Sequence, residues 1–151
     1  MDEHTDDEYH VERLLRKLTI ELRRRGRAIL TDFDITPAQF EALVMAEDMP
    51  RLTIGDLGST LGLAYSTVTD LIDRLERQGY VERIRDESDK RIVRVRVMDK
   101  GQILIEKVLL ARRLYLAKIL AVMSDEKRSA FVDMLSVLGQ QLHDNHVNTD
   151  G

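Results

Sequence analysis

The chain has 151 residues, the size of one ordinary domain, and its 43% of hydrophobic residues excludes intrinsic disorder over most of its length. Aromatic residues make up only 5%, and tryptophan and cysteine are absent, so the core must be aliphatic, without disulfides or thiolate metal sites. The net charge of −4 excludes a uniformly basic binder of polyanions, and a nucleic-acid surface therefore requires local clusters of basic residues.

A first helix is predicted over about residues 8–33, and we assign it to dimerisation. Residues 1–12 carry six acidic side chains and no Lys or Arg, and their beginning is expected to be a charged tail. The apolar residues that follow recur three or four positions apart, as on one face of a helix. This face includes Val11, Leu14, Leu15 and Leu18.

Three further helices are predicted in close succession. Thr36 followed by Pro37 is typical of a helix start, because Thr can cap the helix and Pro at the first position loses no needed N–H group. Thr53 begins the next helix, and Gly62 ends it. The helix after that ends at Gly79, and the short link between the pair is typical of a helix-turn-helix. Its apolar face is formed by Val68, Leu71, Ile72 and Leu75.

Residues 80–97 are predicted to form a β-hairpin with a charged tip. Val93, Val95 and Val97 alternate with arginines, as in a strand with one buried face. Between residues 83 and 100 the chain carries seven basic and four acidic residues, which makes this segment locally basic. Residues 34–100 are therefore predicted to form a winged helix-turn-helix lobe.

Two more helices are predicted, one from Gly101 to about Met123 and one that Ser124 can cap. The first is apolar on nearly every side and, at roughly 33 Å, longer than such a lobe can cover. We assign residues 101–146 to dimerisation and expect a mainly α homodimer with a small β-hairpin, in which the terminal helices interlock. The apolar stripe of the last helix is formed by Phe131, Met134, Leu135, Leu138 and Leu142.

These elements and several motifs resemble the MarR family of bacterial winged-helix transcription regulators over nearly the whole chain. The resemblance implies a dimer with two winged-helix lobes that occupies a palindromic DNA operator, usually as a repressor. It also implies a small-molecule effector, bound between lobe and dimerisation helices, that relieves repression. The matching segments are Ile35–Phe40, Leu52–Leu57, Ser66–Thr69, Leu71–Val81, Ser88–Arg91 and Lys100–Gly101.

Three positions depart from the pattern of the family. Ala64 stands where Ser or Thr often caps the fourth helix, so this cap is expected to be weaker or shifted to Ser66. Asp70 stands where Arg is frequent, and its carboxylate is repelled by phosphates but can accept a hydrogen bond from cytosine N4. Met98 replaces a threonine before the next helix, which leaves Asp99 as the expected cap.

The exposed face of the fourth helix supplies the first set of candidate DNA contacts. Its small hydroxyl residues let the backbone approach phosphates and base edges, and they are taken as base-proximal. The alternative is that the acidic and basic residues of this face, Asp73 included, form ion pairs within the helix. The candidates are Ser66, Thr67, Thr69, Asp70, Arg74 and Arg77.

The tip of the hairpin supplies the second set, Asp89, Lys90 and Arg91. Asp89 and Arg91 match the Asp-x-Arg pattern of the family, in which the carboxylate orients the guanidinium and the Arg enters the minor groove. A narrow A·T-rich groove concentrates negative potential, and Arg94 and Arg96 add positive charge nearby. The alternative is a solvated tip with surface ion pairs.

No other chemistry is indicated by the sequence. Phosphate-loop, nucleophile-elbow and zinc-protease motifs are absent, so neither enzyme activity nor a cofactor is expected. His143 and His146 lie three residues apart, and His4 and His10 lie near the other end, but no tight ligand cluster surrounds them and no metal site is assigned. No apolar run reaches the roughly 18 residues of a membrane span, and we expect a cytoplasmic protein.

The alternative function is a winged-helix module that binds protein instead of DNA. The salt dependence of duplex binding separates the two, because a DNA reader loses affinity steeply as salt rises.

Overall fold

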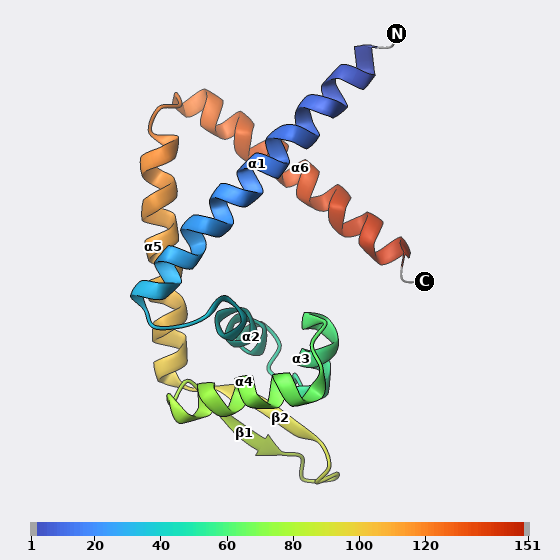
Figure 1. The fold of residues 1–151 in the computed structure, drawn as a ribbon, viewed down its shortest axis with the longest axis vertical. Helices are drawn as coiled ribbons and strands as arrows, with labels where there is room; N and C mark the ends of the chain where they lie inside the picture. The colour runs from blue at the N-terminus through green and yellow to red at the C-terminus, as the bar shows by residue number, and fades with distance from the viewer. Residues whose placement is uncertain (1–2, 150–151) are drawn as a thin grey trace. The chain divides into compact units, whose positions relative to one another are not determined.

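The computed structural model describes the backbone of residues 3–149 and the side chains of residues 6–145. In this part of the chain, six helices and one antiparallel two-stranded sheet confirm the predicted mainly α fold with a small hairpin (Figure 1). In chain order the elements are α1 (Glu3–Asp32), α2 (Pro37–Asp48), α3 (Ile54–Leu61), α4 (Tyr65–Arg77), β1 (Val81–Arg85), β2 (Val93–Val97), α5 (Asp99–Leu120) and α6 (Asp125–Thr149).

The chain divides into two units, Met1–Arg112 and Arg113–Gly151, and α5 runs through the boundary as one helix. Every buried apolar side chain among the described residues lies between Ile29 and Val108, so the core belongs to the first unit. This core is aliphatic, as the composition predicts, with Phe40 as its buried aromatic ring. Its most fully buried large side chains are Leu43, Leu57, Ile72, Leu75, Val68, Val95 and Val108.

The predicted caps of α2 and α3 are confirmed as reciprocal capping boxes. The Thr36 hydroxyl accepts from the N–H of Gln39 at 3.2 Å, and the Gln39 side chain accepts from the N–H of Thr36 at 3.0 Å. Thr53 and Asp56 form the same pair of bonds at 3.0 and 3.1 Å. Gly62 ends α3 with a φ of 64°, in the left-handed region that glycine adopts without strain.

Helix α4 is positioned by its apolar face, which is buried as predicted. Val68, Ile72 and Leu75 are completely buried, and Leu71 is nearly so. At its end Gly79 has a φ of 78°, and the N–H groups of Gly79 and Tyr80 donate to Glu76 and Leu75. Ala64 makes no side-chain cap, which confirms the weaker cap expected at this position. The hydroxyl of Ser66 makes no cap bond either.

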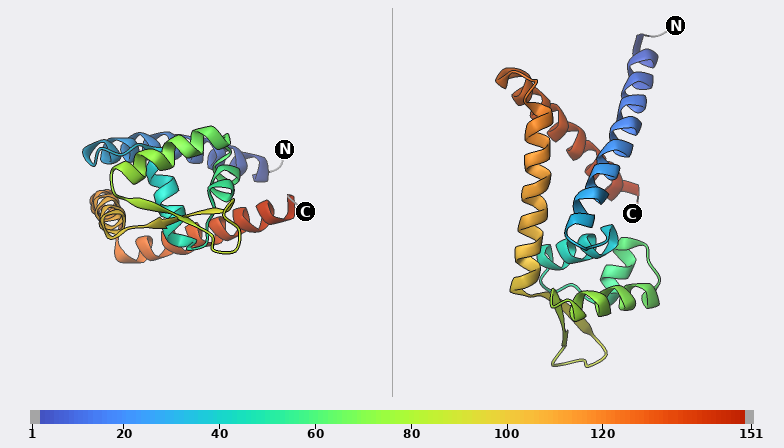
Figure 2. Two further views of the ribbon diagram at one scale, coloured as in Figure 1. Left: turned by 90° about the horizontal axis from the view of Figure 1, so that it is seen from below. Right: turned by 60° about the vertical axis from the view of Figure 1, so that its left-hand side comes forward.

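The hairpin lies beside α4 on one side of the first unit (Figure 2). Its strands pair in register from Val81 opposite Val97 to Arg85 opposite Val93. The loop between α2 and α3 adds to β2, because the N–H of Val95 donates to the carbonyl of Leu52 at 3.1 Å. The wing is therefore fixed both to α4 and to the segment that leads into α3.

Two predicted boundaries are wrong. Helix α1 begins at Glu3, so the acidic stretch that was expected to be a tail is helical. Negative side chains at a helix N-terminus are stabilised by the helix dipole, and Glu12 pairs with Arg16 one turn later at 2.9 Å. Asp99 is the first residue of α5, and Met98 takes the cap position, with its carbonyl accepting from Gln102.

Candidate DNA interface

The exposed face of α4 carries most of the predicted contact residues at the surface. Ser66, Thr67, Asp70, Arg74 and Arg77 are all exposed. Thr69 differs, because it is half-buried and its hydroxyl oxygen is buried without a hydrogen-bond partner among the described residues. The prediction that Thr69 presents its hydroxyl at the surface is therefore wrong, since the helix turns this side chain toward the packed interior.

The N-terminus of α4 is suited to bind an anion. The first intrahelical bond joins the N–H of Val68 to the carbonyl of Ala64. In the described part of the chain the N–H groups of Tyr65, Ser66 and Thr67 have no acceptor, and Ala64 provides no capping side chain. Free N–H groups and the positive end of the helix dipole together attract a phosphate group.

Two carboxylates of α4 are bound by one arginine from β1. Arg83 contacts Asp73 and Glu76, each at 2.7 Å, and also donates to the carbonyl of Thr69 at 3.3 Å. The Arg83 side chain is only 25% exposed, and with Asp73, Glu76 and Arg77 it lines a charged hollow of about 530 Å³. We call this arrangement the Arg83 clamp. Sequence analysis did not single out Arg83, because its partners lie on another element.

The Arg83 clamp takes the place of the ion pairs that could have formed within α4. Asp73 binds Arg83, and Arg77 reaches only the carbonyl of Asp73, at 3.4 Å. Asp70 and Arg74 form no ion pair with each other or with another described residue. The alternative of intrahelical pairing is therefore not what the structure shows, and both side chains are left available at the surface.

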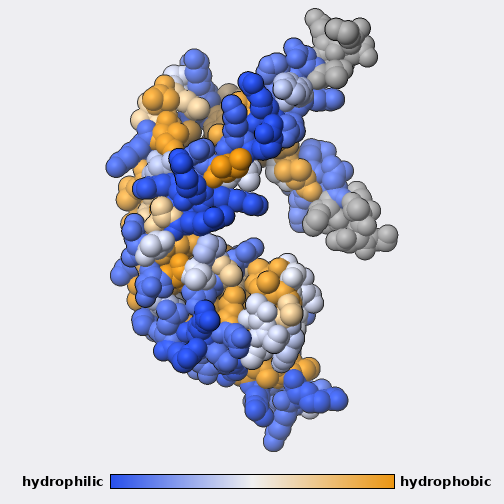
Figure 3. Space-filling model, viewed as in Figure 1, coloured by the Kyte–Doolittle hydropathy of each residue, from blue (hydrophilic) through white to orange (hydrophobic). Residues whose placement is uncertain are grey.

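The wing tip holds its arginine in one orientation. Nε and Nη2 of Arg91 donate to the two carboxylate oxygens of Asp89, both at 3.0 Å, and the backbone N–H of Arg91 adds a bond at 3.1 Å. Bonds from the Arg91 side chain and N–H keep the pKa of Asp89 below its ordinary value, so the carboxylate stays charged. The Arg91 side chain is 91% exposed, and the surface at the tip of the hairpin is hydrophilic (Figure 3).

Asp86 organises the turn of the wing, although it was not among the contact residues predicted from the sequence. Its Oδ1 accepts from the hydroxyl of Ser88 at 2.6 Å and from the N–H groups of Ser88 and Asp89, while its Oδ2 accepts from Arg94 at 3.0 Å. Bonds from Ser88, Arg94 and the N–H of Asp89 hold the pKa of Asp86 well below its ordinary value. An Asp that bonds the backbone two residues on is an Asx turn, and the Asp-Glu-Ser sequence at a hairpin tip is the signal that points to it.

The arginines of β2 are engaged in the fold. Arg94 contacts Asp86 and also donates to the carbonyl of Arg51 at 2.6 Å, and Arg96 binds Glu82 on β1. Arg94 and Arg96 lie near the tip as expected, but each is paired with a carboxylate of the hairpin. Lys90 and Arg91 are the exposed basic residues of the turn itself.

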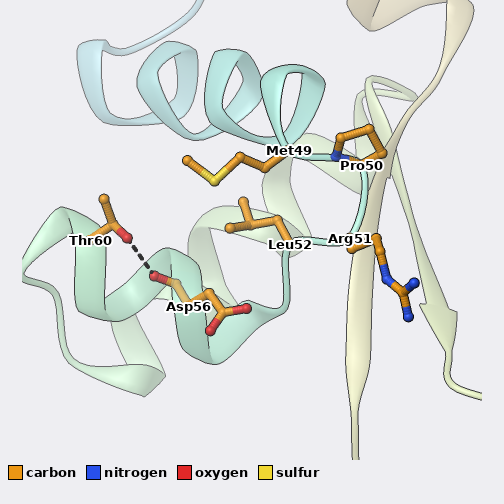
Figure 4. Close-up of a pocket in the computed structure, with 6 residues that line it drawn as sticks. All are labelled: Met49, Pro50, Arg51, Leu52, Asp56 and Thr60. Atoms are coloured by element: carbon orange, nitrogen blue, oxygen red, sulfur yellow. Dashed lines mark hydrogen bonds between the residues drawn. The ribbon is translucent and has the colours of Figure 1, made fainter.

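A second hollow, of about 350 Å³, lies between the α2–α3 loop and α3 (Figure 4). Met49, Pro50 and Leu52 form much of its lining, and Asp56 and Thr60 come from α3. The Asp56 carboxylate already accepts from Thr53, and the Thr60 hydroxyl donates to the carbonyl of Asp56 at 2.9 Å. These polar groups are satisfied locally, so the hollow adds nothing to the interface.

The residues predicted to form the dimer lie at the surface of the single chain. On α1, Val11, Leu14, Leu15 and Leu18 are 40–54% exposed. On α6, Met134, Leu135 and Leu142 are exposed, and Phe131 and Leu138 are half-buried. Apolar residues are thus mixed with charged ones along the surfaces of these helices (Figure 3).

The histidines do not form a metal site within the side chains that are described. Residues 6–145 contain no group of three His, Asp or Glu side chains placed to hold a metal ion. The side chains of His4 and His146 lie outside this range. Within residues 3–149 no helix has the length and apolar character that crossing a bilayer requires.

Comparisons with known proteins agree with this architecture. Residues 35–93 match the profile of the MarR family. The uncharacterized HTH-type transcriptional regulator YsmB of Bacillus subtilis is 35% identical over 140 residues, which cover 93% of this chain and 94% of YsmB.

Solved structures extend the agreement to the fold. A MarR family protein from Bacillus stearothermophilus has a TM-score of 0.83 at 43% identity and covers 95% of this chain and 99% of its own. A MepR mutant of S. aureus bound to an oligodeoxyribonucleotide shares the fold at a TM-score of 0.67 and 23% identity, over 87% of this chain and 97% of its own. These relatives are regulators and not enzymes, as the sequence predicted, and the chain belongs to the MarR family of winged helix-turn-helix, DNA-binding transcription regulators.

Proposed function

We propose that the protein is a homodimeric repressor that binds a palindromic operator in double-stranded DNA. The observation that carries this proposal is the wing tip, where Asp89 orients an almost fully exposed Arg91. A long cation that is held in place away from the protein surface fits a narrow minor groove, whose negative potential attracts arginine.

Helix α4 of each subunit would enter the adjacent major groove. Its unfilled N-terminal N–H groups would bind a phosphate and fix the register, while Ser66, Thr67 and Arg77 would contact the backbone or base edges. Thr69 reaches the groove only if its hydroxyl rotates out of the interior. At the wing, Asp89 would orient Arg91, and Lys90 would contact phosphate.

The dimer follows from the exposed apolar faces of the terminal helices. In the described chain α1 and α6 present rows of exposed leucines and other apolar residues, and a second copy would cover them. Two lobes related by a two-fold axis read two half-sites about 34–36 Å apart, which makes the operator palindromic. A dimer that occupies a promoter excludes polymerase by occupancy alone, and repression is therefore the outcome that we propose.

An effector that relieves repression would bind beside Arg112. The guanidinium of this α5 residue lies 4.9 Å from the ring centre of Phe40 on α2, and its Nε is buried without a hydrogen-bond partner among the described residues. A buried donor that lacks an acceptor favours an anionic group, and the aromatic ring favours a planar one. A screen of small aromatic acids for release of bound operator tests this part of the proposal.

The test of DNA binding is a genome-wide selection with purified protein at about 150 mM salt, a concentration that weakens non-specific phosphate binding. We expect one enriched palindrome, bound by a particle of dimer mass. The Arg91→Ala variant should lose affinity for this palindrome while the dimer persists. The control is Lys107→Ala, which removes one exposed positive charge from α5 and should leave affinity unchanged.

Two outcomes would overturn the proposal. Unchanged affinity of Arg91→Ala would remove the wing from the interface. A folded dimer that enriches no duplex would favour a winged-helix module that binds protein instead.

A further inference from the structure

We propose that Asp70 and Arg74 together read one C·G base pair in each half-site. Asp70 would accept a hydrogen bond from cytosine N4, and Arg74 would donate to O6 and N7 of the guanine. This inference rests on the proposed placement of α4 in the major groove, and it adds a specific base pair to that placement.

The three carboxylates of α4 differ in their partners. In the Arg83 clamp, Asp73 and Glu76 share one guanidinium as their ion-pair partner, each at 2.7 Å. Asp70 is exposed and has no ion pair or side-chain hydrogen bond with any described residue. Among the described residues, Asp70 is therefore the carboxylate of α4 that has no cation partner, on the helix face that we place against DNA.

The negative charge of Asp70 weakens DNA binding unless its carboxylate gains a hydrogen-bond donor. An unpaired carboxylate near phosphates is repelled, and a hydrogen bond from a base edge offsets this repulsion. The donors in the major groove are cytosine N4 and adenine N6. Adenine places its N7 acceptor beside N6, where it repels a carboxylate, whereas cytosine presents no such acceptor. Cytosine is therefore the base that fits Asp70.

Arg74 lies four residues after Asp70, on the same face of the helix. It is also exposed and forms no ion pair with a described residue. Its fork of donors matches O6 and N7 of guanine, the partner of cytosine. The two side chains thus offer one acceptor and one pair of donors, which is the pattern complementary to a C·G pair.

The experiment compares the operator preferences of the wild type and of Asp70→Ala and Asp70→Asn, with Asp48→Ala as control. Asp48 is an exposed acidic residue at the end of α2, so the control removes the same charge elsewhere. We expect the wild type to prefer C·G at one symmetric position of each half-site. Asp70→Ala should lose on the order of tenfold of that preference, at this position alone.

Two further readouts separate base reading from a general effect of charge. Asp70→Ala should bind random duplex more tightly than the wild type, because the repulsion is gone, while it discriminates less. Asp70→Asn should shift the preference toward adenine, whose N6 and N7 match an amide. Asp48→Ala should change neither property. Thermal unfolding verifies that each variant is folded.

The outcomes distinguish this inference from the proposed function. If the wild type enriches a palindrome and the Asp70 variants keep its preference at every position, the inference is wrong and the repressor proposal stands. If Arg74→Ala loses affinity equally for all operator variants, Arg74 is a phosphate contact and the paired reading is wrong. If the wild type enriches no duplex, the proposed function fails, and the inference fails with it.

Discussion

At the scale of single residues, Asp86 shows how one side chain sets the form of the wing. One oxygen binds the turn through Ser88 and Asp89, and the other binds Arg94, which in turn holds the carbonyl of Arg51. The carboxylate must be ionised to accept all of these bonds at once. These same hydrogen bonds lower the pKa of Asp86, because they stabilise its charged form.

Asp86 should therefore contribute a stability that depends on pH. Because folding lowers its pKa, the contribution is complete above the ordinary value near 3.8 and is lost as the pH falls below it. We expect the urea midpoint of Asp86→Asn to lie below that of the wild type at neutral pH, with the difference shrinking at pH values under 3.8. The exposed neighbour Glu87, changed to Gln, is the control and should show little difference at any pH. If the urea midpoints of Asp86→Asn and the wild type differ by the same amount at every pH, the contacts of Asp86 do not depend on its charge.

At the scale of elements, the Arg83 clamp joins α4 to β1 and sets one positive charge against two carboxylates of the candidate interface. The same side chain also reaches the carbonyl of Thr69, so it touches α4 over about two turns. Position and charge are therefore both controlled by one arginine. Substitutions of the clamp can separate these two roles.

Arg83→Met should weaken operator binding by about tenfold at low salt, because two unpaired carboxylates would then face the phosphates. The difference should narrow as salt screens the repulsion. Adding Asp73→Asn and Glu76→Gln to Arg83→Met should restore most of the affinity, which a fluorescence anisotropy titration would measure. A triple variant as weak as Arg83→Met would instead assign the clamp to positioning α4.

The elements themselves were predictable from sequence, because their signals are local. Thr36 and Thr53 cap helices through residues three positions away, and the apolar face of α4 follows from spacing alone. The contacts of Arg83 and Arg94 were not predictable, since each joins elements that only the fold brings together. Asp89 and Arg91, two residues apart, were recognised as a pair from the resemblance to the family, whereas the buried hydroxyl of Thr69 required the structure.

At the scale of the whole molecule, the lobe has a buried apolar core, whereas the terminal helices expose apolar side chains. All described buried apolar side chains fall within residues 29–108, while α1 and α6 keep large apolar residues at the surface. Such surfaces are stable in water when a partner covers them. The proposed second copy would supply that cover.

Leu14→Glu on α1 and Leu135→Glu on α6 should therefore each dissociate the proposed dimer. Burying a leucine is worth about 1.5–3 kcal/mol, and a symmetric dimer contains each site twice, so the loss is about 3–6 kcal/mol. Light scattering over a dilution series would show the shift toward monomer. Met49→Glu, at an apolar site that is 46% exposed and lies outside both predicted dimerisation segments, is the matched control and should keep the dimer mass. Unchanged mass in both leucine variants would place the interface elsewhere.

The bonds around Asp86 and Asp89 also have a thermodynamic consequence. A basic arm that is disordered in solution must lose conformational entropy when it enters a groove, at a cost of roughly 1–2 kcal/mol for each ordered residue. In this wing the turn from Asp86 to Ile92 is already closed by its own hydrogen bonds, and the Arg91 side chain is already directed by Asp89. Most of the conformational entropy of the wing is therefore lost when the chain folds and not when it binds DNA. Less of the electrostatic attraction between the wing and the groove is then offset by ordering, which raises the affinity.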